Sequence, residues 1–194
     1  MEDIQARLTA LDVTKIFFTD LNGRLMSLPV NPDHIPQIVR DGVGFDGSSI
    51  AGMARVDNSD RQLFPDPDSL RILEFRYQTL GCFIGRIFNE RGLRAAADPR
   101  AVLENVVDRA ESDYGYRFVL GPEHEFFLLT GEEFGEKGHS DQAGYFVATP
   151  HDKGEAVRNR IISVLAQSGI EFEKAHHEVT PSQHEINLVP VSPL

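Results

Sequence analysis

Apolar and polar positions in the first part of the chain repeat with two periods, one typical of helices and one typical of strands. Residues 3–11 carry apolar side chains at helical spacing, which predicts a short amphipathic helix. Two apolar runs in residues 14–30 flank an Asn-Gly pair, and this arrangement predicts a β-hairpin with a tight turn. A short helix is predicted in residues 31–42, where Gly42 is suited to ending it.

The pattern then changes to a polar, glycine-rich stretch. Residues 44–60 are rich in Gly, Ser, Asp and Asn, which predicts a loop, and loops of this length commonly carry function. Two apolar runs follow in residues 69–76 and 80–88, and both predict strands. We therefore expect residues 1–95 to form a small, strand-rich α+β domain.

A second unit, residues 96–194, is expected after this point. Asp98 as N-cap and Pro99 in the first turn mark the beginning of its first helix. The following pattern predicts a strand in 116–129, a loop in 131–150, a helix in 152–169 and two strands in 170–179 and 183–191. With about three strands and two helices, this unit is expected to keep at least one unpaired sheet edge.

Composition narrows the class of protein. The 194 residues suffice for one domain or two small ones, and 41% of them are hydrophobic, enough for a core. The net charge of −11 argues against nucleic acid as a partner, because phosphate binding depends on clustered Lys and Arg. The single cysteine, Cys82, excludes an internal disulfide and fits a reducing compartment. The acidic N-terminal stretch is unlike a signal peptide, and no apolar run reaches the roughly 18 residues of a membrane span, so we expect a cytoplasmic protein with no membrane partner.

Two glutamates alternate along the strand predicted in residues 116–129. Side chains alternate across a strand, so Glu123 and Glu125 are expected on one face, roughly 7 Å apart. Phe127 and Leu129 share that face. Either the carboxylates bind a cation, because unpaired burial is costly, or they are simply exposed beside partly buried phenylalanines. The pattern leaves both alternatives open.

Two further glutamates strengthen the cation hypothesis. The predicted hairpin can bring Glu178 and Glu185 to one end of the sheet, close to Glu123 and Glu125. Hard oxygen ligands of this kind suit Mg²⁺ or Mn²⁺ rather than Zn²⁺. Two such ions are suited to holding the oxygens of a phosphoryl group during its transfer.

The histidines between these glutamates are predicted to be hydrogen-bonding or structural residues. His176 and His177 are adjacent, so they face opposite sides of a strand and cannot both ligate one ion from one face. This adjacency also disfavours a cupin-like barrel with His and Glu ligands. His124 and His184 alternate away from the neighbouring glutamates. The chain has neither a GxxxxGK[ST] nor a GxGxxG motif, so a nucleotide would be held in another way.

The chain resembles type I glutamine synthetase. The stretches FTDLNG, FDGSSIAG, SDRQLFPDP, DPRAVL, GPEHEFFLL and HHEVTPSQHEINL occur in the order they have in that family, from about residue 10 to 190. The resemblance implies an N-terminal β-grasp domain and the first part of a catalytic domain with an antiparallel sheet. It also implies condensation of L-glutamate with ammonia at the expense of ATP, through γ-glutamyl phosphate, with two or three Mg²⁺ or Mn²⁺ ions. The full-length family members form homo-oligomeric, double-ring dodecamers with active sites shared between neighbouring subunits.

The resemblance also implies roles for individual glutamates. Glu125, Glu178 and Glu185 resemble the ligands of one ion. Glu123 resembles a ligand of the second ion, which the family completes with a histidine and a glutamate further along the chain. Glu173 resembles a position that contacts the nucleotide.

Asp46, in the FDGSS motif, resembles the aspartate that a neighbouring subunit offers to the ammonium ion. A carboxylate there stabilises NH₄⁺ and helps to take its proton, so that ammonia attacks the acyl phosphate. The local alternative is a turn residue that caps its own backbone.

The chain departs from the family in length and at one motif. Family members are more than twice as long, so we expect this chain to carry about half of the active site and to be inactive alone. Gly85 and Arg86 stand where a Cys-Asp pattern is more usual. Two alternatives remain: a γ-glutamyl ligase that uses another amine, which Asp46 argues against, and a short non-catalytic paralogue that assembles with or regulates a full-length synthetase.

Overall fold

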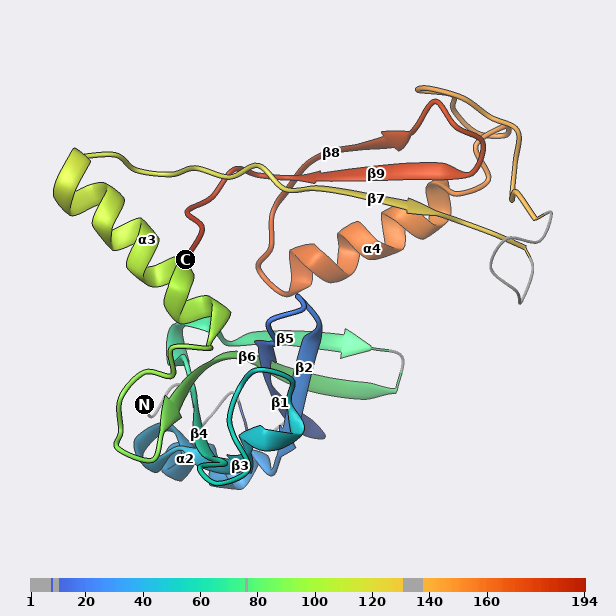
Figure 1. Cartoon of the computed structure of the whole chain (residues 1–194). Helices are drawn as coiled ribbons and strands as arrows, with labels where there is room; N and C mark the ends of the chain where they lie inside the picture. Colours follow the sequence, from blue (N-terminus) through green and yellow to red (C-terminus); the bar gives the residue numbers. More distant parts are fainter. Residues whose placement is uncertain (1–7, 9–10, 76, 131–137) are drawn as a thin grey trace. The chain divides into compact units, whose positions relative to one another are not determined.

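The computed structural model describes residues 8, 11–75, 77–130 and 138–194. The chain forms two compact units, residues 1–117 and residues 118–193, and each contains its own sheet (Figure 1). The helix predicted in residues 3–11 lies outside the described residues, apart from Leu8 and Leu11, which both contribute to the core of the first unit.

The first unit is built on a six-stranded mixed sheet. Its strands are β1 (Val13–Thr19), β2 (Leu25–Val30), β3 (Val43–Asp46), β4 (Asp60–Pro65), β5 (Arg71–Phe75) and β6 (Gln78–Asn89). The strand order is β2-β1-β6-β4-β3, and β5 also pairs with β6. Only the β1–β6 pair is parallel, and the other pairs are antiparallel. This arrangement confirms the predicted β1–β2 hairpin and the α+β class.

The core of the first unit lies around β6. Its buried apolar side chains are Leu8, Ile16, Phe18, Ile35, Ile38, Met53, Leu63, Leu70, Phe83, Ile87 and Ala95. Gly85 sits within this core, and a Cβ there would lie 2.5 Å from Leu63 Cδ1 and 2.9 Å from Ile16 Cγ2. A glycine at this position therefore allows side chains of β1 and β4 to meet over β6.

The loop prediction for residues 44–60 is wrong at its beginning. Val43–Asp46 form β3, which pairs antiparallel with β4 from Val43 opposite Leu63 to Asp46 opposite Asp60. A strand this short and glycine-containing has little periodicity of its own, and the sequence analysis did not predict its partner β4. Asp46 then caps a short 3₁₀ helix, Gly47–Ser49.

The helices begin and end where the sequence signals predict. The helix α2 (Ile35–Asp41) follows a 3₁₀ turn and ends at Gly42, which has a φ of 73°. The helix α3 (Pro99–Tyr114) begins with Asp98, whose Oδ1 accepts a hydrogen bond from the backbone N–H of Arg100. Across the described parts of the chain, the helices are all too short or too polar to cross a membrane.

An ion-pair network attaches α3 to the first unit. Glu104 accepts from Arg86 at 2.9 Å and from Arg94 at 2.5 Å. Asp66, which follows β4, pairs with Arg86 and Arg100 at 3.0 Å each. The compact unit of residues 1–117 includes α3. The domain limits 1–95 and 96–194 stay a prediction. Arg86, one of the residues that departs from the usual family pattern, is part of this network.

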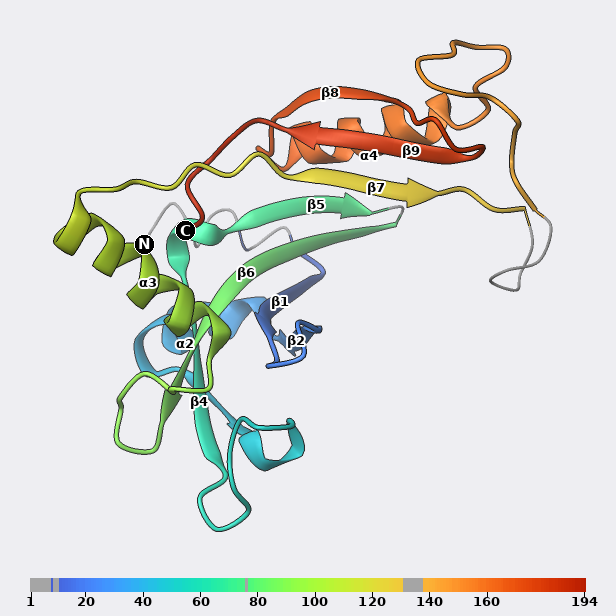
Figure 2. The same cartoon turned by 45° about the horizontal axis from the view of Figure 1, so that its top comes forward.

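The second unit is a three-stranded antiparallel sheet with one helix along one face (Figures 1 and 2). Its elements are β7 (Glu123–Phe127), α4 (Glu155–Gln167), β8 (Phe172–His177) and β9 (Gln183–Leu188), and the strand order is β7-β9-β8. The predicted hairpin and helix are confirmed. The strand predicted in 116–129 is shorter than expected, and among the described residues 138–150 no helix or strand forms, in agreement with the predicted loop.

Candidate metal site on the sheet of the second unit

Strand pairing sorts the polar side chains of the second unit onto two faces. Directly paired residues point to the same side of a sheet. Glu125 pairs with Glu185, Glu123 with Asn187, and His176 with Glu185. We call this side the carboxylate face; its polar members on the strands are Glu123, Glu125, Lys174, His176, Gln183, Glu185 and Asn187, and Phe127, opposite Gln183, shares it. The other side carries His177 and His184, so the adjacent histidines face opposite ways, as predicted.

Glu178 and Glu185 meet at one end of the carboxylate face. One ligand atom each of His176, Glu178 and Glu185 lies within 4.8 Å of the others. The Nε2 atom of His176 is 2.8 Å from Glu178 Oε1 and 3.8 Å from Glu185 Oε2. Glu178 follows β8 directly, and its backbone N–H still donates to the carbonyl of Gln183 at 2.8 Å. The hairpin therefore brings the two carboxylates together, as the sequence suggested.

The two carboxylates have opposite pKa shifts. Burial raises the pKa of Glu185, and the neighbouring Glu178 carboxyl raises it further, against a smaller opposing effect of Asn187. The backbone N–H of Val179 donates to Glu178 at 3.1 Å and lowers the pKa of that carboxyl. Two negative charges are therefore unfavourable here without a cation, and a divalent ion would favour the charged form of both groups.

Two side-chain amides donate hydrogen bonds to the glutamates Glu123, Glu125 and Glu185. The Nδ2 atom of Asn187 donates to Glu123 at 3.0 Å and to Glu185 at 2.7 Å. The Nε2 atom of Gln183 donates to Glu125 at 2.5 Å. The sequence analysis missed both amides, although Gln183, Glu185 and Asn187 follow the period of two that places them on one face.

The donor set fits a hard divalent cation. Four carboxylates from the three strands and their ends share the carboxylate face, and oxygen-rich sets of this kind suit Mg²⁺ or Mn²⁺. Two buried polar atoms on this face, Asn187 Oδ1 and His176 Nδ1, have no hydrogen-bond partner among the described residues. They leave two further potential ligand atoms beside the carboxylates.

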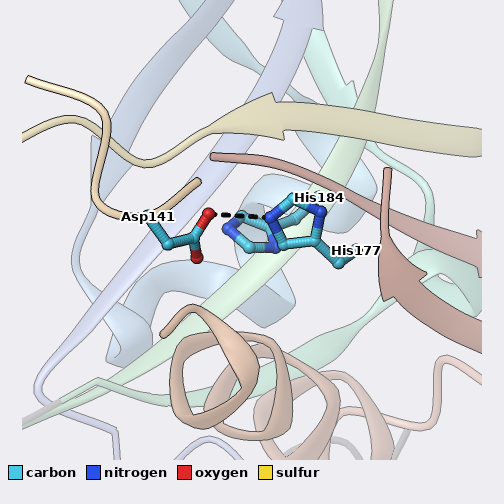
Figure 3. A group of neighbouring side chains, drawn as sticks. All are labelled: Asp141, His177 and His184. Carbon is cyan, nitrogen blue, oxygen red and sulfur yellow. Dashed lines mark hydrogen bonds and ion pairs between the residues drawn. The ribbon is translucent and has the colours of Figure 1, made fainter. Parts of the chain in front are cut away.

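The opposite face carries a second group of polar side chains, in which Asp141 and His177 form a buried pair. His177 is fully buried, and its Nε2 lies 2.9 Å from Asp141 Oδ1 (Figure 3). Its Nδ1 lies 2.6 Å from the carbonyl oxygen of Glu178. Both of these oxygens are hydrogen-bond acceptors. Burial favours a higher pKa for Asp141, but hydrogen bonds from His177 and from the backbone N–H groups of Lys153 and Ser182 outweigh it and lower the pKa to about 2.

Arg158 and Asp152 form the second pair of this group. The guanidinium of Arg158, on α4, reaches Asp152 at 2.5 Å and 3.2 Å and His184 Nδ1 at 2.7 Å. Burial and the Arg158 charge lower the pKa of His184, so its neutral ring accepts this hydrogen bond. We call Asp141, Asp152, Arg158, His177 and His184 together the buried layer.

Asp141, His177 and His184 converge closely enough to suggest a metal site, but their surroundings disfavour one (Figure 3). Both nitrogens of His177 and Nδ1 of His184 already have hydrogen-bond partners, and the Arg158 cation is adjacent. The remaining nitrogen, His184 Nε2, faces the backbone at Gly154, where even a Cβ would lie 2.3 Å away. This group is a hydrogen-bonded support for the sheet.

The two other predicted site residues are members of neither group. Asp46 ends β3 in the first unit, is exposed, and accepts from the Ser48 backbone at 2.8 Å and the Ser48 hydroxyl at 2.7 Å. These bonds lower the pKa of Asp46 and show the local capping role. Glu173 is exposed on β8, at a register shift between Phe172 and Lys174, and such bulges re-aim a side chain.

Comparisons with known proteins agree with this fold. Residues 11–90 match the family described as glutamine synthetase, beta-Grasp domain, and residues 96–194 match glutamine synthetase, catalytic domain. The glutamine synthetase of Halobacterium salinarum is 37% identical over 193 residues, covering 97% of this chain and 42% of that protein. The glutamine synthetase of Thermotoga maritima is 38% identical over 178 residues, covering 90% of this chain and 40% of that protein.

A solved structure shows the same architecture. The cryo-EM structure of Plasmodium falciparum glutamine synthetase superimposes with a TM-score of 0.83 at 19% identity, over 98% of this chain and 44% of that one. The protein is thus an α+β protein with a β-grasp domain followed by part of a catalytic domain. It belongs to the glutamine synthetase family. The chain spans about two fifths of the length of the relatives it matches.

Proposed function

We propose that this chain contributes the divalent-cation site of an ATP-dependent ligase that condenses L-glutamate with ammonia. Membership of the glutamine synthetase family supports the reaction class. The observation that carries the proposal is the approach of Glu178 and Glu185, which have ligand atoms within 4.8 Å of each other, on a face where Glu125 is the residue paired with Glu185. We assign these three glutamates to one Mg²⁺ or Mn²⁺ ion and Glu123 to a second.

The remaining residues on the carboxylate face would keep these ligands in place. A bound divalent cation would screen the negative charge of the ATP phosphates while the γ-carboxylate of glutamate attacks the γ-phosphorus and ADP leaves. Asn187 and Gln183 hold Glu123, Glu125 and Glu185 by hydrogen bonds, which limits their movement when the charge changes. In the proposal Glu173 contacts the nucleotide.

Asp46 is proposed to act in the second step. Its carboxylate would bind NH₄⁺ and accept a proton, after which the nitrogen lone pair attacks the acyl carbon and phosphate leaves. The lowered pKa of Asp46 keeps its carboxylate charged for binding NH₄⁺. We infer that it serves the site of a neighbouring copy in a homo-oligomer, a dodecamer as the family resemblance implies. The second ion needs further ligands outside these 194 residues, so we expect this chain alone to bind the cation without turnover.

Calorimetric titration of Mn²⁺ into the 194-residue chain tests the proposal. Glu178→Ala or Glu125→Ala should weaken binding at least about tenfold, which corresponds to about 1.4 kcal/mol. His124→Ala is the matched control, because His124 is exposed on the same strand but faces away from Glu123 and Glu125. Its affinity should stay within about twofold of the parent. Equal losses in all three variants, or no binding by the parent chain, would contradict the assignment.

A further inference from the structure

We propose that the buried Asp141–His177 pair is a positioning element for the cation site, which fixes Glu178 and the turn of residues 178–182 from behind the sheet. The inference rests on the proposed function, because it assigns a supporting role at the same site. The His177 side chain lies on the face opposite the carboxylate face, so the pair would act through the backbone of Glu178 and the turn.

The first part of the argument is the link from Asp141 to the backbone of Glu178. His177 ends β8 and immediately precedes Glu178. Its ring lies within hydrogen-bonding distance of two oxygens, with Nδ1 2.6 Å from the Glu178 carbonyl oxygen and Nε2 2.9 Å from Asp141 Oδ1. The imidazole of His177 therefore connects the peptide group of Glu178, a proposed metal ligand, to the buried carboxylate of Asp141. Because His177 is 0% exposed and Asp141 5% exposed, water does not compete for these bonds.

The second part of the argument is the hydrogen bonding between Asp141 and Ser182, at the other end of the turn. The Oδ1 atom of Asp141 also accepts from the backbone N–H of Ser182 at 3.2 Å, and the Ser182 hydroxyl lies 3.3 Å from the Asp141 nitrogen. Ser182 has a φ of 64°, a left-handed conformation that is costly for a residue with a side chain. Such a conformation persists when its surroundings hold it, and Asp141 supplies these contacts.

The third part of the argument is the effect of these Asp141 and His177 contacts on the carboxylates of Glu178 and Glu185. Glu178 lies at one end of the turn, and Gln183, which begins β9 two residues before Glu185, lies at the other. The carboxylates of Glu178 and Glu185 repel each other in their charged forms, and a free turn would let them separate. Hydrogen bonds from the opposite face fix both ends of the turn. The spacing of the Glu178 and Glu185 carboxylates is therefore set before the cation binds. Residues that orient metal ligands in this way typically account for about 10–100-fold in metal affinity.

The test compares Mn²⁺ affinity and backbone protection in variants of the whole 194-residue chain. Asp141→Ala should lower Mn²⁺ affinity about 10–100-fold by calorimetry. Asp141→Asn should lose less, because its Oδ1 still accepts from His177 and Ser182. Asp98→Ala is the matched control. Asp98, like Asp141, is a buried aspartate with a basic partner, here Arg94 at 2.5 Å, but it lies in the first unit. It should leave Mn²⁺ affinity unchanged even where it lowers the Tm.

Hydrogen exchange without metal gives a second readout that does not depend on the proposed function. The hydrogen-bonded backbone amides of Glu178, Ser182 and Gln183, at the two ends of the turn, should exchange faster in both Asp141 variants and normally in Asp98→Ala. Failure of the parent chain to bind Mn²⁺ would contradict the proposed function. The exchange result would still test whether Asp141 and His177 hold the turn in place. If Asp141→Ala does not fold, Asp141→Asn decides. Parental affinity and parental exchange in a folded Asp141 variant would overturn the inference.

Discussion

The two faces of the sheet in the second unit differ in how their carboxylates are paired. In the buried layer each carboxylate has a basic partner: Asp141 has His177, and Asp152 has Arg158. On the carboxylate face, by contrast, Glu178 and Glu185 approach each other, with amides and His176 as their nearest donors. Balanced buried charge favours the folded state, whereas crowded carboxylates oppose it unless a cation binds. This difference supports a structural role for the buried layer and the functional role that we propose for the carboxylate face.

The largest effect is expected from breaking the buried layer. Arg158→Leu leaves Asp152, which is 4% exposed, without its cation. Removing one partner of a buried ion pair costs about 3–5 kcal/mol. Thermal unfolding should show a Tm lower by about 6–20 °C. The control is Arg109→Ala, which breaks the exposed pair with Asp113 and should cost less than about 1 kcal/mol. A similar Tm for both variants would mean that the buried layer contributes little to stability.

An intermediate effect is expected from acidification. Asp141 has a folded-state pKa of about 2 against an ordinary value of 3.8, so its stabilisation is complete above about pH 4. It is lost as the pH falls through about 2, and it amounts to about 2 kcal/mol. Denaturant unfolding between pH 5 and pH 2 should show this loss in the parent chain.

The matched variant for the acid experiment is Asp141→Asn. It has no carboxyl at this position, so its free energy of unfolding should depend less on pH over the same interval. Parallel pH profiles for the parent and the variant would show that Asp141 is not the group responsible.

The smallest effect is expected on the carboxylate face, and it has the opposite sign. Because burial and Glu178 raise the pKa of Glu185, the folded protein disfavours its charged form, and this cost grows as the pH rises past the ordinary range of a glutamate. Glu185→Gln should therefore raise the Tm of the metal-free chain at pH 7 slightly, by about 1–4 °C. The same variant should bind Mn²⁺ poorly. A lower Tm at pH 7 would contradict the view that this face is strained without a cation.

The sequence predicts the carboxylate face well because its information is local. Glu123 and Glu125 alternate on one strand, and Glu178 and Glu185 flank one short hairpin turn, so strand geometry alone suggests their proximity. The same alternation separates His176 from His177. The hairpin of β1 and β2 and the ends of α2 and α3 are similarly marked by turn and capping residues.

The supporting contacts could not be predicted because their partners are distant in the sequence. Asp141 lies in a loop 36 residues before His177, with no periodicity to indicate where its side chain points. The pairing of β3 with β4 and the attachment of α3 through Asp66 and Arg86 have the same cause. These contacts depend on tertiary packing, which single-sequence patterns do not encode.

The most direct test of the account is to locate Mn²⁺ bound to this chain by its anomalous X-ray scattering. We predict an ion on the carboxylate face, about 2.1 Å from oxygens of Glu125, Glu178 and Glu185, a distance typical of a small hard divalent cation. An ion between Asp141, His177 and His184 in the buried layer would contradict the assignment of the two faces, as would crystals in Mn²⁺ with no ion on the carboxylate face.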